Sequence, residues 1–245
     1  MCYTAFIVKK QENKDFDKIL KRELEKKQWE NSDGFASLKL SKNFEVKEYI
    51  RSVDYLPASK MLESFNYYNL FHFRLATAGK KDNQNVHLWK ARNWIFSHNG
   101  SVMQFSDDIF SDSYLFFRLL CKNLPKDNRK LNDKHVAKAL EKWINKTDLY
   151  GRGFLLNLKH KKLYIFGNIE VYNYDNYFIL SSSKLDFQKK IKRFGTEFYL
   201  NYEILKKEIR GYYVYNLNTN TLKKLKDTSS DYTSYYEYYQ NKHLF

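Results

Sequence analysis

The order of its periodic segments constrains the fold of this sequence most. The N-terminal part alternates short β-forming runs with one amphipathic helix, two further helices follow, and the C-terminal part returns to β-forming runs separated by turn residues. Strands towards both ends with helices between them favour a single α+β domain in which helices cover sheets. A chain of 245 residues is long enough to form a core that needs no disulfide to support it.

Hydrophobic periodicity places the expected elements along the chain. Apolar residues recur on one face of three predicted helices, over residues 15–27, 112–122 and 133–145. Strands are predicted over residues 2–8, 34–40, 71–77, 94–97, 154–158, 163–167, 177–182 and 212–217. These elements predict one domain over residues 1–226, followed by a polar, Tyr-rich tail over residues 227–245.

The charge of the chain leaves one alternative function open. A net charge of +15 together with 18% aromatic residues is typical of proteins that hold single-stranded nucleic acid. The lysines are scattered in short clusters, however, and no long basic arm is present. Because AT-rich codons alone would produce a surface rich in Lys, Asn and Tyr, a nucleic-acid partner stays an alternative and not the leading hypothesis.

The cysteine content and the short apolar runs indicate the cellular compartment in which the protein is expected. The sequence holds only Cys2 and Cys121, too few for a disulfide framework in a chain of this length. No apolar run reaches the ~18 residues of a membrane span, and the charged residues after Val8 do not fit a signal peptide. We therefore expect a cytoplasmic protein without a membrane partner.

The Met-Cys start offers a nucleophile. Cys is small enough at position 2 for removal of Met1, which leaves Cys2 with both a thiol and a free α-amine. The ordinary pKa of such an amine is about 8 and that of the thiol about 8.5, so the amine can take the thiol proton near neutral pH. Cys2 is therefore a candidate nucleophile with its own base.

Three further motifs each allow a structural and a chemical interpretation. Asn99-Gly100 follows an apolar run and is an ordinary turn signal, yet its amide groups could also stabilise an oxyanion. Arg74 stands within an apolar strand pattern and needs an anionic partner, either a structural carboxylate or a substrate carboxylate. Ser111 and Asp112 open a helix, where an N-cap is the simplest role.

Together and in this order, these pieces resemble the class II glutamine amidotransferase domain. That domain is the N-terminal-nucleophile glutaminase module of glucosamine-6-phosphate synthase, asparagine synthetase and amidophosphoribosyltransferase. Besides the Met-Cys start, the resemblance rests on five segments, namely Asp33–Ala36, Arg74–Gly79, Asn85–His87, His98–Gly100 and Ser111–Ser113. It extends to the strand predicted at residues 177–182, and departs from the family at Ala78, where several members have His.

The resemblance implies a fold and a catalytic group. The fold is a four-layer αββα sandwich of two mostly antiparallel sheets covered by helices, formed by a single glutamine amidotransferase domain over residues 1–226. The resemblance assigns Cys2 as the nucleophile and its α-amine as the base. It also assigns the side chain of Asn99 and the backbone N–H of Gly100 as the oxyanion hole.

The resemblance also implies how substrate is held. Arg74 would bind the α-carboxylate of glutamine, Asp112 its α-ammonium group, and Thr77 would line the same pocket. This agrees with the chemistry of glutamine, which carries one fixed anion and one fixed cation and so needs an Arg-type and an Asp-type group.

The leading functional hypothesis is cleavage of glutamine, or of another γ-glutamyl amide, through a thioester on Cys2. The ammonia would pass to a synthase supplied in trans or simply be released. No cofactor is expected, and no metal, because the spacings between His72, His87 and His98 fit no common zinc pattern. A nucleic-acid-associated protein and a catalytically silent binding protein on the same fold are the alternatives.

Overall fold

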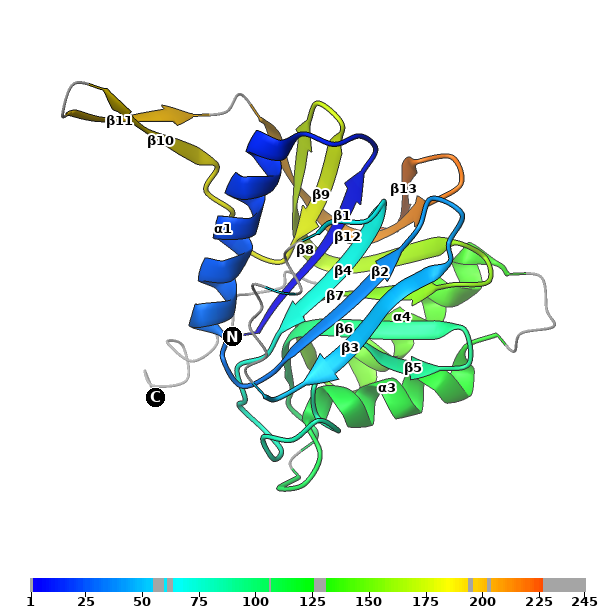
Figure 1. Cartoon of the computed structure of the whole chain (residues 1–245). Helices are drawn as coiled ribbons and strands as arrows, with labels where there is room; N and C mark the ends of the chain where they lie inside the picture. Colours follow the sequence, from blue (N-terminus) through cyan, green and yellow to red (C-terminus); the bar gives the residue numbers. More distant parts are fainter. Residues whose placement is uncertain are drawn as a thin grey trace, which may run out of the picture. The chain divides into compact units, whose positions relative to one another are not determined.

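The computed structural model describes residues 2–54, 60, 64–105, 107–125, 131–193, 196–201 and 204–226 (Figure 1). Met1 and the expected tail over residues 227–245 lie outside the described residues. The chain divides into two compact units and passes between them more than once. Unit 1 comprises Met1–Leu75, Lys81–Leu88 and Glu170–Glu208, and unit 2 comprises Ala76–Lys80, Trp89–Ile169 and Ile209–Phe245.

Unit 1 is built on an antiparallel sheet. Its strands, in their order across the sheet, are β3 (Val46–Ser52), β2 (Phe35–Leu40), β4 (Tyr68–Phe73), β1 (Tyr3–Lys9), β9 (Tyr177–Ser181) and the C-terminal end of β8 (Lys162–Tyr174). The strands β10 (Gln188–Arg193) and β11 (Thr196–Asn201) form a separate antiparallel pair. Because β1 lies in the interior of the sheet, between β4 and β9, the start of the chain is fixed by hydrogen bonds on both sides.

Helix α1 (Lys14–Glu30) covers the sheet of unit 1. It begins at Asn13, whose side chain accepts a hydrogen bond from the Phe16 amide at 3.1 Å, as an N-cap should. Its apolar face buries Phe16, Leu20 and neighbouring residues in a core that includes side chains of β1 and β4. Burial of this one face fixes the rotation of the helix about its axis.

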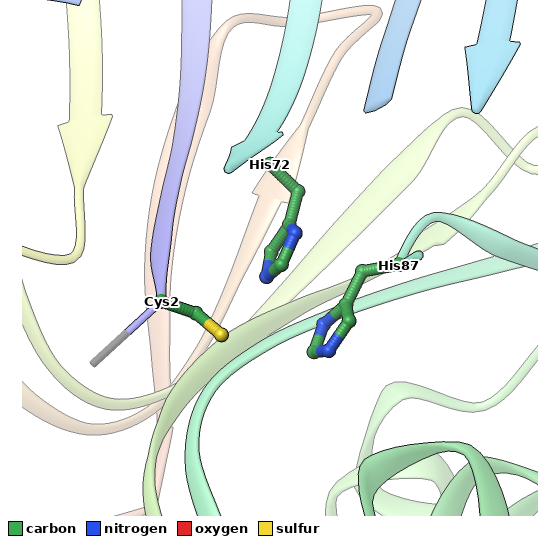
Figure 2. Close-up of side chains that lie close together, drawn as sticks. All are labelled: Cys2, His72 and His87. Carbon is green, nitrogen blue, oxygen red and sulfur yellow. The ribbon is translucent and has the colours of Figure 1, made fainter. Parts of the chain in front are cut away.

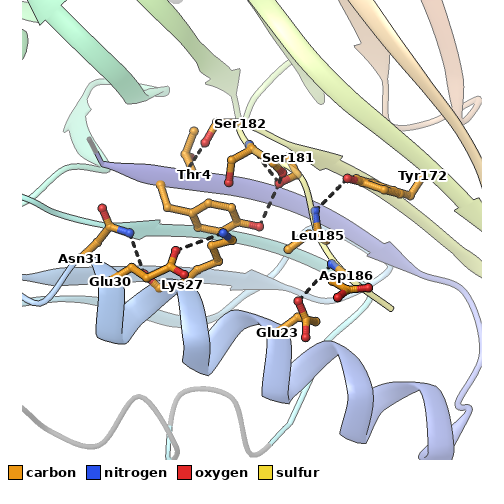
Figure 3. Close-up of polar contacts among 12 residues, drawn as sticks. Thr4, Glu23, Lys27, Glu30, Asn31, Tyr172, Ser181, Ser182, Leu185 and Asp186 are labelled. Carbon is orange, nitrogen blue, oxygen red and sulfur yellow. Dashed lines mark hydrogen bonds and ion pairs between the residues drawn. The ribbon is translucent and has the colours of Figure 1, made fainter. Parts of the chain in front are cut away.

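Polar contacts fasten the segment after β9 to the same unit (Figure 3). The Glu23 carboxylate of α1 accepts a hydrogen bond from the Asp186 amide at 3.0 Å, and the Tyr172 hydroxyl accepts one from the Leu185 amide at 2.9 Å. Nearby, the Ser182 hydroxyl accepts a hydrogen bond from the Thr4 amide at 2.9 Å. The first two bonds satisfy backbone N–H groups beyond the last paired residue of β9, and the third joins the same segment to β1.

Unit 2 also combines antiparallel strands with helices. Its strands are β5 (Trp89–Ala91), β6 (Trp94–Val102), β7 (Leu149–Asn157), the first part of β8, and β12 (Leu205–Asn216) with β13 (Thr221–Lys226). The helices α3 (Asp112–Asn123) and α4 (Asp133–Lys146) bury Phe116, Leu120, Val136 and Leu140 in one core with β6 and β7. The α+β class is therefore confirmed. Among the described residues, no helix is both long enough and apolar enough to cross a membrane.

One local prediction was wrong, and one of the two interpretations of Asn99-Gly100 is excluded. Strand β4 ends at Phe73, so Arg74 follows the strand and does not lie inside it. The Asn99-Gly100 pair makes no turn, because β6 continues to Val102 and pairs with β7 through both residues. In each case the tertiary pairing of strands outweighed the local pattern that suggested the boundary.

Candidate active site

The antiparallel pairing of β1 and β4 places Cys2 beside the end of β4. Tyr3 lies opposite Phe73 in the register, so the residue before β1 meets the residues after β4. The Sγ atom of Cys2 lies 3.4 Å from both the amide nitrogen and the carbonyl oxygen of Leu75. The thiol donates to the carbonyl, and the amide donates to the sulfur. When the thiol loses its proton, the amide still stabilises the thiolate.

Arg74 is the neighbour of Leu75 and is almost fully buried, with 2% of its surface exposed. Its backbone is held by the segment before β2, since its N–H donates to the Gly34 carbonyl at 2.7 Å and its carbonyl accepts from the Asp33 amide at 2.8 Å. The Asp33 carboxylate in turn pairs with Lys81 at 2.6 Å. The Asp-Gly segment and the Arg74 segment, which the sequence resemblance linked to one family, are therefore adjacent in unit 1.

Two buried histidines lie beside Cys2 (Figure 2). The rings of His72 and His87 are stacked, with centroids 3.7 Å apart and planes inclined by 9°. A ring nitrogen of each histidine and the Cys2 sulfur all lie within 4.8 Å of one another. Figure 2 shows the sulfur directed towards the two rings. Sequence reasoning grouped His72 and His87 with His98 and not with Cys2, because Cys2 stands 70 positions before His72 and this spacing carries no known motif.

Arg51 of β3 holds the loop that carries His87. Its Nε donates to the carbonyl oxygens of Val86 and His87, each at 3.0 Å, and its Nη2 donates to the Val86 carbonyl at 2.6 Å. The same Nη2 lies 3.1 Å from the carbonyls of Asn83 and Gln84. A guanidinium offers five N–H donors in a fixed plane, which suits a cluster of carbonyls that converges on it.

Asn99 and Gly100 lie in unit 2, on the strand pair β6–β7. Asn99 is buried and stands opposite Arg152, and Gly100 stands opposite Gly151. A Cβ atom on Gly100 would collide with the carbonyl oxygen of Tyr150, and the φ angle of Gly100 is +156°. The two strands therefore approach each other so closely here that only glycine fits.

Asp112 is the first residue of α3 and is also buried. The N-cap is Ser111, as predicted, and its side chain accepts a hydrogen bond from the Tyr114 amide. The Asp112 Oδ2 atom accepts a hydrogen bond from the Val102 amide at 2.6 Å, and Oδ1 accepts one from the Ser113 amide at 2.7 Å. The carboxylate therefore ties the start of α3 to the end of β6, and its remaining lone pairs can accept further hydrogen bonds.

His98 connects β6 with α3 and was not singled out as a structural residue from the sequence. Its Nδ1 lies 2.9 Å from the Ser113 hydroxyl and its Nε2 lies 3.2 Å from the Tyr150 carbonyl. Because a carbonyl can only accept, Nε2 carries the proton and Nδ1 accepts from Ser113. Burial lowers the pKa of His98 to about 4, so the ring is neutral near pH 7.

Thr77 is exposed, in the short segment Ala76–Lys80 of unit 2. Gly79 of this segment has a φ angle of +70°, and a Cβ atom there would meet the backbone of Phe110 and Ser111. The Lys80 amide donates to the Ile109 carbonyl at 3.2 Å. The segment is therefore fixed against the residues that lead into α3.

The six predicted site residues are divided between the two units. Cys2 and Arg74 belong to unit 1, where the Cys2 sulfur contacts the backbone of Leu75, the residue that follows Arg74. Unit 2 contains the other four, which are Thr77, Asn99, Gly100 and Asp112. Cys121 lies elsewhere in unit 2, on α3, and burial raises the pKa of its thiol to about 12. Cys121 is partly buried and packs against the core of unit 2, so the interpretation of a buried hydrophobe holds in part.

Comparison with family models gives one match. Residues 56–173 match the model described as class-II glutamine amidotransferases, a range that includes Arg74, Asn99 and Asp112. This part of the chain is therefore similar to the class II glutamine amidotransferases. No protein of curated function matches the sequence.

Two solved structures share the fold of this chain. The glutamine phosphoribosylpyrophosphate amidotransferase from B. subtilis, complexed with ADP and GMP, is similar with a TM-score of 0.55 at 10% identity. A structure of the allosteric regulatory enzyme of purine biosynthesis is similar with a TM-score of 0.54 at 12% identity. Each alignment covers 93% of this chain but 50% of the other, so this chain spans about half the length of these two proteins. The predicted fold class, an α+β sandwich, is confirmed.

Proposed function

We propose that this chain cleaves a γ-glutamyl amide, converting glutamine to glutamate and ammonia through a thioester on Cys2. The observation that carries the proposal is the Cys2 sulfur beside the Leu75 backbone, next to the buried Arg74, in a chain similar to this family. Adjacent segments of unit 1 then supply both the nucleophile, Cys2, and a cation that can bind a carboxylate, Arg74.

The first half of the reaction forms the thioester. After removal of Met1, the α-amine of Cys2 takes the proton of the thiol, and the thiolate attacks the side-chain amide carbon of glutamine. The carbonyl π electrons move to oxygen, and the Asn99 side chain and Gly100 N–H are proposed to stabilise that oxyanion. The oxyanion collapses, the C–N bond breaks, and the departing nitrogen takes the proton from the α-ammonium group to leave as ammonia.

The second half releases glutamate. The free α-amine accepts a proton from a water molecule, whose oxygen attacks the thioester carbon. A second oxyanion forms and collapses, the C–S bond breaks, and the thiolate regains a proton. One water is consumed, and the net products are glutamate and ammonia.

The proposed binding groups match the charges of the substrate. Arg74 would bind the α-carboxylate in a bidentate manner, and Asp112 would accept hydrogen bonds from the α-ammonium group. Asp112 keeps lone pairs for this role although both of its oxygens already accept a backbone bond. Thr77 is proposed to line the same pocket. Free glutamine is the simplest substrate, and Ala78, where several members have His, is one position at which another γ-glutamyl compound would be accommodated.

The ammonia has two proposed destinations, namely release into solution or transfer to a synthase supplied in trans. Because a thiolate nucleophile requires a reducing environment, cytoplasmic placement is part of the proposal. No cofactor is needed for either half of the reaction.

The test is ammonia release from glutamine by protein whose mass shows that Met1 is absent. We expect activity in the natural sequence, loss of at least about 10³-fold in Cys2→Ala, and no change in Cys121→Ala, since a covalent nucleophile cannot be replaced by water at comparable rates. Arg74→Lys should raise KM more than it lowers kcat. Equal rates for Cys2→Ala and the natural sequence would refute the proposal and leave a binding function, including the nucleic-acid alternative.

A further inference from the structure

The cluster of Cys2, His72 and His87 has the composition of a metal site. One thiol and two imidazoles, all within unit 1, present ligand atoms that lie within 4.8 Å of one another (Figure 2). Thiolate and imidazole ligands favour zinc and its neighbours in the first transition row over magnesium or calcium. We infer that these three residues bind one soft divalent cation of the zinc class.

The distances are close to those that such a cation requires. Tetrahedral zinc, with Zn–S about 2.3 Å and Zn–N about 2.0 Å, keeps its ligand atoms roughly 3.3–3.6 Å apart. The ligand atoms therefore need to close by up to about 1.5 Å. The two stacked rings must also tilt apart, because the lone pair of each imidazole lies in its ring plane. Rotation about the side-chain torsions of Cys2, His72 and His87 supplies both changes.

The surroundings of the cluster also suit a cation. His72 and His87 are both buried and their ring centroids lie 3.7 Å apart, so both imidazoles are near one point beside the Cys2 sulfur. Cys2 is the partly exposed member and gives the ion a path from solvent. The Leu75 amide, 3.4 Å from the sulfur, remains a donor to a metal-bound thiolate.

Processing of the N-terminus would complete the site. Once Met1 is removed, the α-amine and thiol of Cys2 can close a five-membered chelate ring through Cα and Cβ. The resulting set of one sulfur and three nitrogens fills four tetrahedral positions. The cation would then occupy both the nucleophile and its base, so bound zinc switches the amidohydrolase off. This inhibition rests on the proposed function, whereas the binding does not.

Cobalt(II) provides a direct test, because it substitutes for zinc and gives visible spectra. Processed protein freed of metal with a chelator should bind one Co²⁺ per chain with a thiolate-to-cobalt charge-transfer band, and Zn²⁺ should displace it. Cys2→Ala should remove the band. His72→Gln and His87→Gln should each weaken binding by more than about tenfold, the least that loss of a supporting group costs. The matched controls Cys121→Ala and His135→Gln should bind as the natural sequence does.

Absence of the band, or unchanged binding in both histidine variants, would overturn the inference. Should those variants fail to fold, alkylation of Cys2 in the natural sequence decides it. Zn²⁺ but not Mg²⁺ must slow the alkylation of Cys2. A peptide of residues 2–9 is the control, because it has the α-amine and thiol of Cys2 without the two histidines. Zn²⁺ must protect the protein at concentrations at least about tenfold lower than those that protect this peptide. Equal protection of peptide and protein refutes the site.

The two proposals fail independently. Protein that binds Co²⁺ through Cys2 but releases no ammonia from glutamine refutes the proposed function alone. Protein that is active, yet shows no thiolate band and no zinc inhibition, refutes the metal site alone.

Discussion

The Nδ1 atom of His98 and the Oγ atom of Ser113 lie 2.9 Å apart, which joins strand β6 to the first turn of helix α3. The other ring nitrogen lies 3.2 Å from the Tyr150 carbonyl of β7. A neutral ring with its proton on Nε2 satisfies both contacts, and burial disfavours the charged form of the ring. The residue next to Asn99 is therefore fixed on both sides.

This arrangement predicts how stability depends on pH. The pKa of His98 is lowered by burial from 6.5 to about 4 in the folded chain. The unfolded chain therefore binds more protons between these values, and stability falls as the pH falls from about 6.5 to about 4. At pH 4.5 His98 should account for a loss of about 2–3 kcal/mol relative to pH 7.

Urea unfolding at both pH values in the natural sequence and in His98→Gln measures this loss. The variant should be less stable at pH 7 but should lose less stability on acidification. The same loss in both proteins would show that His98 does not titrate as burial requires.

Gly100→Ala should destabilise unit 2. The added Cβ would collide with the Tyr150 carbonyl oxygen on β7, and the positive φ angle adds strain, together costing about 1–3 kcal/mol or more. Thermal unfolding gives the difference. Ser101→Ala, at the next residue on β6, is the control and should change stability by less than about 1 kcal/mol. An Ala variant as stable as this control would contradict the close approach of β6 and β7.

Arg51→Met should release the loop that carries His87. The substitution keeps much of the apolar stem but removes the donors to the carbonyls of Asn83, Gln84, Val86 and His87, at a cost of about 1.5–3 kcal/mol. Amide hydrogen exchange over residues 83–88 should become faster. Lys47→Met removes a charge from an exposed position of the same strand and should leave that exchange unchanged.

Alkylation at pH 8 should distinguish the two cysteines. Burial raises the pKa of the Cys121 thiol to about 12, so only about one molecule in 10⁴ carries a thiolate there at that pH. Iodoacetamide should therefore label Cys2 alone in the folded chain, as read by peptide mass spectrometry. Unfolding in urea should make both residues reactive. Equal labelling of Cys121 in the folded chain would contradict its burial on α3.

The sequence predicted the helices better than the strands. The helices expected at residues 112–122 and 133–145 correspond to α3 (Asp112–Asn123) and α4 (Asp133–Lys146). Their caps and apolar faces are local signals that one segment carries by itself. Strand β3 (Val46–Ser52) was not predicted, because its residues are mostly exposed or partly exposed and show little hydrophobic alternation.

In the candidate site, too, the sequence predicted what local motifs carry and missed what depends on tertiary contacts. Cys2, Arg74, Asn99 and Asp112 were proposed because each stands in a short motif whose order along the chain resembles a family. The pairing of His72 with His87, and the contact of Arg51 with the loop, depend on strand register and on side chains that reach across 15 to 36 positions. Such contacts leave no local pattern, so only the folded chain reveals them.

The way in which Arg51 holds the loop has a consequence for tolerance to mutation. The guanidinium donates to main-chain carbonyl oxygens of this loop, and every amino acid supplies the same oxygen. The hydrogen bond from Arg51 to the Gln84 carbonyl therefore does not depend on which side chain stands at position 84. Variation should accumulate at that position among descendants of this chain while Arg51 stays fixed, so one anchored arginine leaves its neighbours free to diverge.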